Sequence, residues 1–273
     1  MSMNDVYGRA YDRKMVGKRR LLIVIIIVCS AVFAVSAFML IQYYRANYEA
    51  ESVFDELRML DGDGEPGFED PDLYAKRRAH YLDLLARNYD LVGWLKIFDT
   101  NVDYPVMQTV DERDYYLHRD FNEEYSAAGV LFASDISDIS KPSDVVIVFG
   151  HMMKSGSMFG GLKKYTDEDY LREHRIVRFD TLEEERYYEI FLVFIESVNT
   201  DEPSEFRYYD ASDFADEAEF DEFMSQAHEK EMFDTGVTAA YGDEILALST
   251  CEYTRKDGRL VLLAKRLAPE GDT

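Results

Sequence analysis

Cysteine is scarce in this chain, and its placement excludes a disulfide framework. Only two cysteines occur in 273 residues, Cys29 and Cys251. Because Cys29 lies inside a long apolar segment, Cys251 has no partner for an intrachain disulfide in the rest of the chain. An unpaired cysteine is either a buried side chain without a chemical role or a reactive thiol. Cys251 is therefore the first residue to consider for chemistry.

Positive charge is also in short supply. The chain has 30 Lys and Arg residues against 54 Asp and Glu residues, which gives a formal net charge of −24. Residues 1–20 carry six basic and two acidic side chains, so the remainder has a formal charge of −28. Such an acidic surface repels the phosphates of nucleic acids, and we exclude nucleic-acid binding as a function.

Metal-binding residues at the required spacing are missing as well, and so are internal repeats and low-complexity tracts. The segment Asp61-x-Asp63-Gly64 resembles the start of a calcium-binding loop. However, Pro66 and Asp72 stand where such a loop needs glycine and glutamate. We therefore expect no metal ion and no other cofactor.

One long hydrophobic run is present near the N-terminus. Residues 21–41 contain no charged side chain, and the run is long enough to span a bilayer as a helix. Basic residues before it and acidic sequence after it predict a signal anchor, with the tail 1–20 in the cytoplasm and the rest outside the cell membrane. A cleaved signal peptide is the alternative, since Ala34 and its neighbours could form a cleavage site, but the apolar run is too long for one.

In the remaining sequence the spacing of apolar residues changes once, from a helical pattern to short strand-like runs. Helical spacing at 45–60 and 73–89 flanks a linker or loop at 61–72, and we assign residues 42–91 to a helical stalk with N-terminal helices. From residue 92, short apolar runs between turn residues predict a β-sandwich or β-barrel, interrupted by one long helix at 212–228 that Ser212 would cap. The runs that we predict as strands are 93–98, 102–108, 129–134, 144–151, 175–181, 187–197, 244–253 and 259–265.

Cys251 lies at the end of one of these predicted strands. Loop residues with an Asp257-Gly258 turn signal follow, and the next strand opens at Arg259. If the two strands form a hairpin, Arg259 lies beside the thiol, where a guanidinium favours the thiolate and can stabilise an oxyanion. Arg255 is the rival, but its position inside the loop makes Arg259 the better candidate. A buried, inert cysteine remains the alternative at this point.

A cysteine nucleophile needs a proton-transfer partner, and five histidines are available. His151 closes the apolar strand VVIVFG, so that, like Cys251, it stands at a strand end. His118, in YYLHRDF, is a second candidate. His80, His174 and His228 lie on predicted helices or in polar sequence, where solvated or capping roles are more common.

Several segments form a recognisable set: VGWLKI, DYPVMQ, YYLHRDF, FGHMMKSGSMFGGLKKY and LSTC followed by an arginine that opens the next strand. Together they resemble one known family, the class B sortases, which are membrane-anchored cysteine transpeptidases of Gram-positive bacteria. The similarity covers residues 92–266. It departs at Met152, where the family more often has asparagine; the three candidate reacting groups are unaffected, but the wall of the pocket differs.

This resemblance implies a mainly β fold, a closed sortase-type barrel of about eight strands, with N-terminal helices, one long inserted helix and a preceding transmembrane helix. It implies that residues 92–268 form the catalytic domain and that His151, Cys251 and Arg259 are its catalytic residues. Cys251 would cleave a C-terminal sorting motif after threonine through a thioester and pass the protein to a cell-wall amine. Ser249 and Thr250 either line the substrate groove or pack structurally.

The implied partners are secreted proteins with a C-terminal sorting signal and an amine acceptor, either a peptidoglycan precursor or a pilin-type protein. The sequence has no such sorting signal of its own, so we expect the enzyme rather than its substrate. Two alternatives remain. One is a non-catalytic surface domain that acts by binding and keeps Cys251 unreactive, and the other is a Cys-His hydrolase that releases its acyl group to water.

Overall fold

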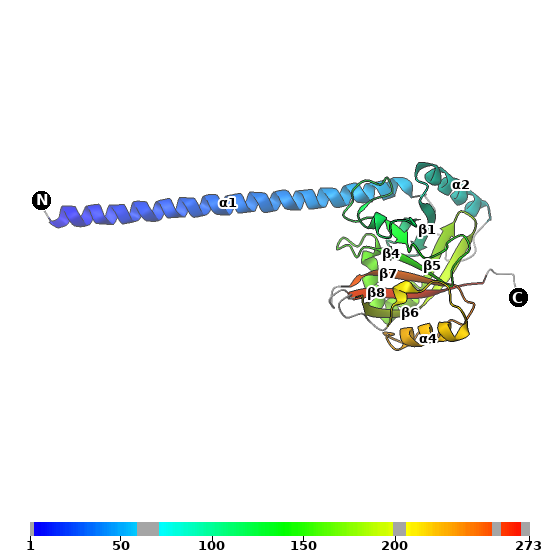
Figure 1. Ribbon diagram of the computed structural model, residues 1–273. Coiled ribbons are helices and arrows are strands. Elements are labelled where there is room, and N and C mark those ends of the chain that lie inside the picture. The colour runs from blue at the N-terminus through cyan, green and yellow to red at the C-terminus, as the bar shows by residue number, and fades with distance from the viewer. Residues whose placement is uncertain (1–2, 59–70, 199–205, 253–257, 269–273) are drawn as a thin grey trace. The chain divides into compact units, whose positions relative to one another are not determined.

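The computed structural model describes residues 3–58, 71–198, 206–252 and 258–268 (Figure 1). The chain divides into two compact units, Met1–Tyr48 and Glu49–Thr273. The loop that resembles a calcium site, from Asp61 to Pro66, lies outside the described residues, as does Arg255. Among the residues that are described, no group of three or more His, Cys, Asp or Glu side chains could hold a metal ion.

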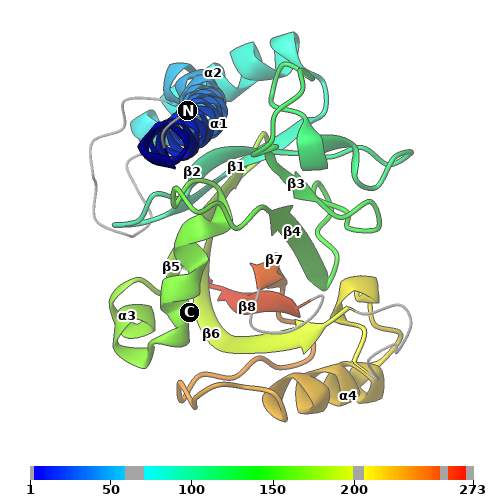
Figure 2. The same ribbon diagram turned by 90° about the vertical axis from the view of Figure 1, so that its left-hand side faces the viewer.

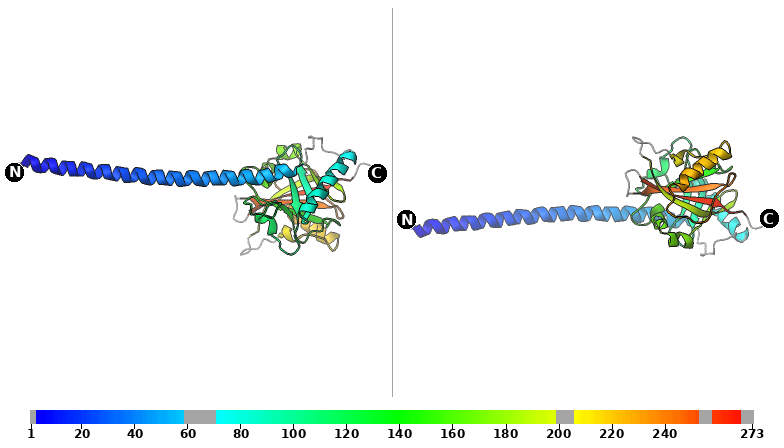
Figure 3. Two further views of the ribbon diagram at one scale, coloured as in Figure 1. Left: turned by 90° about the horizontal axis from the view of Figure 1, so that it is seen from above. Right: turned by 90° about the horizontal axis from the view of Figure 1, so that it is seen from below.

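The first unit is helical. Helix α1 (Met3–Leu57) is continuous and includes Leu22–Gln42, a stretch with a mean hydropathy of 2.9 and no buried residues (Figure 3). By length and composition this stretch is suited to cross a membrane, as the uncharged run at 21–41 indicated. Cys29 lies within it and is exposed.

The second unit is built on a closed β-barrel (Figure 2). Around the barrel the strands follow the order β1-β2-β3-β4-β7-β8-β6-β5. Each of the eight predicted strand segments is confirmed as a strand, with ends that shift by two residues or fewer. The strands are β1 (Leu91–Ile97), β2 (Asp103–Met107), β3 (Leu131–Ala133), β4 (Val145–Gly150), β5 (Ile176–Thr181), β6 (Glu185–Ser197), β7 (Ile245–Glu252) and β8 (Gly258–Arg266).

The predicted hairpin between the last two strands is confirmed. Strands β7 and β8 pair antiparallel, with Cys251 directly opposite Arg259. Strand β4 pairs with β7 in parallel, in a register that runs from Val145 opposite Ile245 to Gly150 opposite Thr250. Because parallel neighbours end at the same edge of a sheet, β4 and β7 bring their carboxyl ends together.

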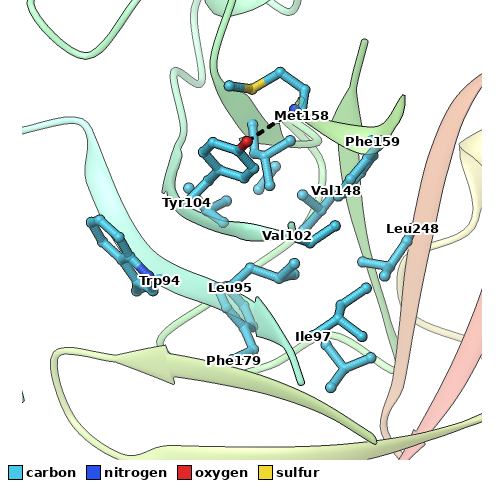
Figure 4. Close-up of a cluster of buried hydrophobic side chains, with 14 of the residues drawn as sticks. Trp94, Leu95, Ile97, Val102, Tyr104, Val148, Met158, Phe159, Phe179 and Leu248 are labelled. Atoms are coloured by element: carbon cyan, nitrogen blue, oxygen red, sulfur yellow. Dashed lines mark hydrogen bonds between the residues drawn. The ribbon is translucent and has the colours of Figure 1, made fainter. Parts of the chain in front are cut away.

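Apolar side chains from both faces of the barrel strands form a large buried cluster (Figure 4). Alternate residues of each strand point inward, as the period of a β-strand requires. Trp94 and Tyr104 are both buried, and the Tyr104 hydroxyl accepts a hydrogen bond from the backbone N–H of Met158 at 3.3 Å (Figure 4). The other side chains labelled in this cluster are Leu95, Ile97, Val102, Val148, Phe159, Phe179 and Leu248.

A second apolar cluster lies outside the barrel, under helix α4 (Glu217–His228). This helix is the predicted long helix, but its start was wrong. The helix begins five residues after Ser212, and the carboxylate of Asp216 caps it by accepting hydrogen bonds from the N–H groups of Ala218 and Glu219. The Ser212 hydroxyl is used elsewhere, because it donates to the carbonyl of Ile136 at 2.9 Å.

The N-terminal helices pack on the barrel. Phe54 and Leu57, in the last turns of α1, have no exposed surface. Helix α2 (Pro71–Arg87) is held by Arg77, a buried side chain whose guanidinium contacts the carboxylates of Asp180 at 3.2 Å and Glu185 at 2.8 Å. The end of α1 is therefore part of the core of the second unit. The short helices are η1 (Tyr115–His118), η2 (Phe159–Thr166), α3 (Glu168–Glu173) and η3 (Tyr208–Asp210).

Candidate active site

The candidate residues gather where β4 and β7 end. The last pair of this parallel ladder joins Gly150 to Thr250, and the residues that follow them in the chain are His151 and Cys251. Cys251 also faces Arg259 across the antiparallel ladder, where opposed residues have Cα atoms about 4.5–5.5 Å apart. The backbone thus brings the three predicted residues to one edge of the barrel. The side chain of Cys251 lies outside the described part of the chain.

His151 is half-buried, and one of its two ring nitrogens is already engaged. Its Nε2 lies 2.8 Å from the backbone carbonyl oxygen of Leu117. A carbonyl oxygen only accepts hydrogen bonds, so Nε2 carries the hydrogen and Nδ1 is the nitrogen left for proton transfer. Burial lowers the pKa of His151 below its ordinary value of 6.5, and the charges of His118 and Arg259 lower it further, whereas the Leu117 carbonyl acts in the opposite direction.

The other histidines fall into two groups. His118 lies beside the site, because its ring stacks on the ring of His151. Each of the remaining three has a hydrogen-bond partner of its own: His80 contacts the carbonyl of Leu57, His174 that of Tyr170, and His228 the carboxylate of Glu231. The structure thus leaves His151 and His118 as the histidines at this edge.

A cavity of about 200 Å³ opens beside these residues, and its wall includes His151, Ser249, Thr250 and Arg259. Ser249 is buried, and its hydroxyl lies 2.8 Å from the hydroxyl of Tyr208. Thr250 is also buried, but its Oγ1 has no hydrogen-bond partner among the described residues. Both residues therefore line the cavity, and the hydroxyl oxygen of Thr250 is itself buried. A larger hollow of about 460 Å³ near the start of β1 has no His or Cys in its wall.

The loop after His151 folds back on itself. The N–H of Phe159 donates to the His151 carbonyl at 3.0 Å, and Met152 forms an isolated β-bridge with Met158. Met158 has a φ of 51°, which non-glycine residues rarely adopt, and its N–H is held by Tyr104. At Gly160, a Cβ atom would approach the Met153 carbonyl oxygen to 2.3 Å. The backbone around His151 is therefore closely constrained.

Arg259 is half-buried at the start of β8. Its Nη1 donates to the carbonyl of Gly258 at 3.1 Å, a contact within its own strand. The guanidinium lines the same cavity as His151. An arginine in this setting can place donors beside a substrate carbonyl and can favour the ionised form of a neighbouring thiol.

Sequence reasoning missed two contributors to this site. The carbonyl of Leu117 fixes the hydrogen of His151, and Tyr104 holds the loop that follows it. A backbone carbonyl leaves no signal in a residue pattern, and Tyr104 appeared only as one aromatic residue of a predicted strand. His118, the second candidate for catalysis, lies next to His151.

Comparison with known proteins gives consistent results. The sortase domain model matches residues 95–267. Sortase B of Listeria monocytogenes is 35% identical over 192 residues, which is 69% of this chain and 74% of that protein. Among solved structures, sortase B from Bacillus anthracis aligns with a TM-score of 0.68 and 33% identity, covering 82% of this chain and 99% of the other. A mutant form of Clostridium perfringens sortase B gives a TM-score of 0.68, 26% identity, and coverage of 79% and 97%.

Proposed function

This chain belongs to the class B sortases, a family of cysteine transpeptidases, and from that premise we propose that Cys251, His151 and Arg259 carry out its reaction. The reaction is cleavage of a C-terminal sorting motif after its threonine, followed by transfer of the new carboxyl end to a cell-wall amine. The observation that best supports the assignment is the register of β7. It sets Cys251 opposite Arg259 on β8, and it pairs the residues just before Cys251 and His151 with each other.

Cys251 is the nucleophile. Its thiolate sulfur attacks the carbonyl carbon of the threonine, and the electron pair of the C=O bond moves to the oxygen. When this tetrahedral intermediate collapses, the C–N bond breaks and the C-terminal remnant leaves as an amine. The guanidinium of Arg259 favours the thiolate that begins this sequence.

His151 moves the proton. The Nε2–H group is occupied by the Leu117 carbonyl, so the proton that reaches the leaving amine comes from Nδ1. In the second half-reaction the same nitrogen takes a proton from the incoming amine, which attacks the thioester and releases Cys251. The lowered pKa of His151 makes the imidazolium a readier proton donor, while only a minor fraction of the enzyme carries that proton at neutral pH.

Arg259 also stabilises the developing oxyanion, and the cavity wall holds the substrate. Thr250 lines this wall, but its Oγ1 is buried, so it contributes shape rather than a hydrogen bond to the sorting peptide. Ser249 contributes shape to the wall, because its hydroxyl is committed to Tyr208. These two residues complete the proposed substrate-binding set.

The proposed location follows from the N-terminal helix. The apolar stretch within α1 acts as a signal anchor, with residues 1–20 in the cytoplasm and the catalytic barrel, residues 92–268, outside the cell membrane. There the enzyme meets secreted proteins that carry a sorting signal and an acceptor amine from a peptidoglycan precursor or a pilin-type protein.

Mass spectrometry of the full chain in detergent micelles tests the proposal. The protein is incubated with sorting-type pentapeptides extended beyond their threonine, and a covalent acyl adduct on Cys251 is expected with one peptide family. The adduct should be absent in Cys251→Ala and reduced in His151→Ala and Arg259→Ala. Peptide cleavage that persists in Cys251→Ala would refute the assignment. Products that do not change when an amine is added would identify a hydrolase instead.

A further inference from the structure

His118 is in direct contact with the proposed catalytic histidine. It is the last residue of η1 and is exposed. Its ring stacks on that of His151, with ring centroids 5.3 Å apart and an angle of 24° between the planes. This is an offset-stacked arrangement, which aromatic pairs prefer to a direct face-to-face one. The ring of Tyr125 lies 6.4 Å from that of His118.

The backbone beneath His118 is held in place from several directions. The Ser126 N–H donates to the His118 carbonyl at 3.0 Å. Gly129 has a φ of 59°, and a Cβ atom there would come within 2.5 Å of the Leu117 carbonyl oxygen. That carbonyl is the acceptor for His151 Nε2. The absence of a side chain at Gly129 therefore leaves space for the Leu117 carbonyl. Leu117 and His118 are neighbours in the chain, and both contact the imidazole of His151.

From this arrangement we propose that His118 is a positioning residue, whose ring and the adjacent Leu117 carbonyl together clamp the His151 imidazole so that Nδ1 faces the cavity. The hydrogen bond alone leaves the imidazole free to rotate about the Nε2–oxygen direction. The stacked ring of His118 removes that freedom, because rotation would break the contact between the two faces. The catalytic part of this inference rests on the proposed function, whereas the clamp itself does not.

A second consequence concerns charge. When His118 is protonated, its positive charge lies close to His151 and opposes the imidazolium form that the leaving amine needs. Arg259 of β8 acts in the same direction. From the segment before η1, Arg113 and Asp114 line the same cavity with opposite charges. Arg119 is directed elsewhere, because its Nη1 donates to the Tyr115 carbonyl at 2.8 Å.

Two substitutions separate the ring of His118 from its charge. His118→Ala removes both, and His118→Phe keeps a stacking ring without a titratable group. We expect His118→Ala to lower kcat roughly 10-fold, because a loosened catalytic group loses part of its alignment, with KM nearly unchanged. His118→Phe should restore most of kcat. Both variants should raise the pKa of His151, since both remove the neighbouring charge.

The measurement uses the full chain in micelles, labelled with ¹³C-histidine, and follows the NMR titration of His151 alongside kcat, KM and the pH–rate profile. His228→Ala is the matched control, because His228, the last residue of α4, contacts the carboxylate of Glu231 and its loss should leave the His151 titration unchanged. Fluorescence of Trp94, the single tryptophan, verifies folding.

The outcomes separate the two proposals. A His151 titration that is identical in His118→Ala and the wild type overturns the charge effect, and a kcat that is unchanged in His118→Ala while His151→Ala is inactive overturns the clamp. Failure of His118→Phe to restore kcat overturns the role of the stacked ring. If His151 is not catalytic, His151→Ala keeps its activity while His118→Ala still shifts the His151 titration, and the proposed function fails alone.

Discussion

Replacing Phe54 by alanine tests whether the end of α1 belongs to the core of the catalytic unit. Phe54 has no exposed surface, and its ring packs edge-on against that of Tyr104 with centroids 5.3 Å apart. Truncating a buried phenylalanine to alanine costs about 3–5 kcal/mol, because the transfer free energy is lost and a cavity remains. For a unit of this size that corresponds to a lower melting temperature by roughly 6–20 °C.

The assay is urea unfolding of the full chain in micelles, followed by the fluorescence of Trp94. This residue is a suitable reporter because it is buried and its Nε1–H donates to the carboxylate of Asp103. The backbone carbonyl of Asp103 in turn accepts a hydrogen bond from Arg58, the residue that follows α1. Tyr89→Ala is the matched control, since Tyr89 is 84% exposed and its loss should change stability by less than about 0.5 kcal/mol. A Phe54→Ala variant as stable as this control would refute the docking of α1 on the barrel.

Two further predictions concern the site and the inserted helix. Arg259→Gln should lower kcat by about 10²–10³-fold through loss of an oxyanion donor. His151 must carry a proton to release the amine, so its pKa, which Arg259 helps to lower below 6.5, sets the basic limb of the kcat/KM profile for the sorting peptide. That limb should move to higher pH in this variant, and an unmoved limb would contradict the cause assigned. Asp216→Ala should cost about 1 kcal/mol of unfolding free energy, since it removes the N-cap of α4; an Asp216→Ala variant as stable as the wild type would show that the cap is misassigned.

The strands could be predicted from the sequence because each is a short apolar run between turn residues. Strand β7 illustrates this, since Ile245–Leu248 are apolar and the turn residues before β8 complete a hairpin pattern. The barrel order could not be derived from the runs themselves, because it depends on which strands pair over long distances. The parallel pairing of β4 with β7 is such a case. Closure of the barrel was expected only from the resemblance to a family.

The reacting groups of the candidate site could be predicted from the sequence, because they are side chains of recognisable chemical types. A thiol and a histidine at strand ends, with an arginine opening the next strand, could all be read from the chain. The contacts that orient His151 come from Leu117 and His118, on a short helix more than thirty residues earlier. Their proximity follows from tertiary packing and leaves no local pattern. For the same reason the burial of Phe54 could not be inferred from a helix that also contains a membrane-type stretch.

The position of β8 in the barrel determines when the site can form. This last strand lies between β6 and β7, so a chain that is synthesised from its N-terminus cannot close the barrel until residues 258–266 are available. Pairing of strands that are distant in the sequence is slow, because the chain loses conformational entropy on loop closure before the stabilising contacts form. Cys251 therefore cannot pair with Arg259 before residues 258–266 have been synthesised. A nascent chain that ends before Arg259 carries the cysteine without the arginine that we propose as its activating partner.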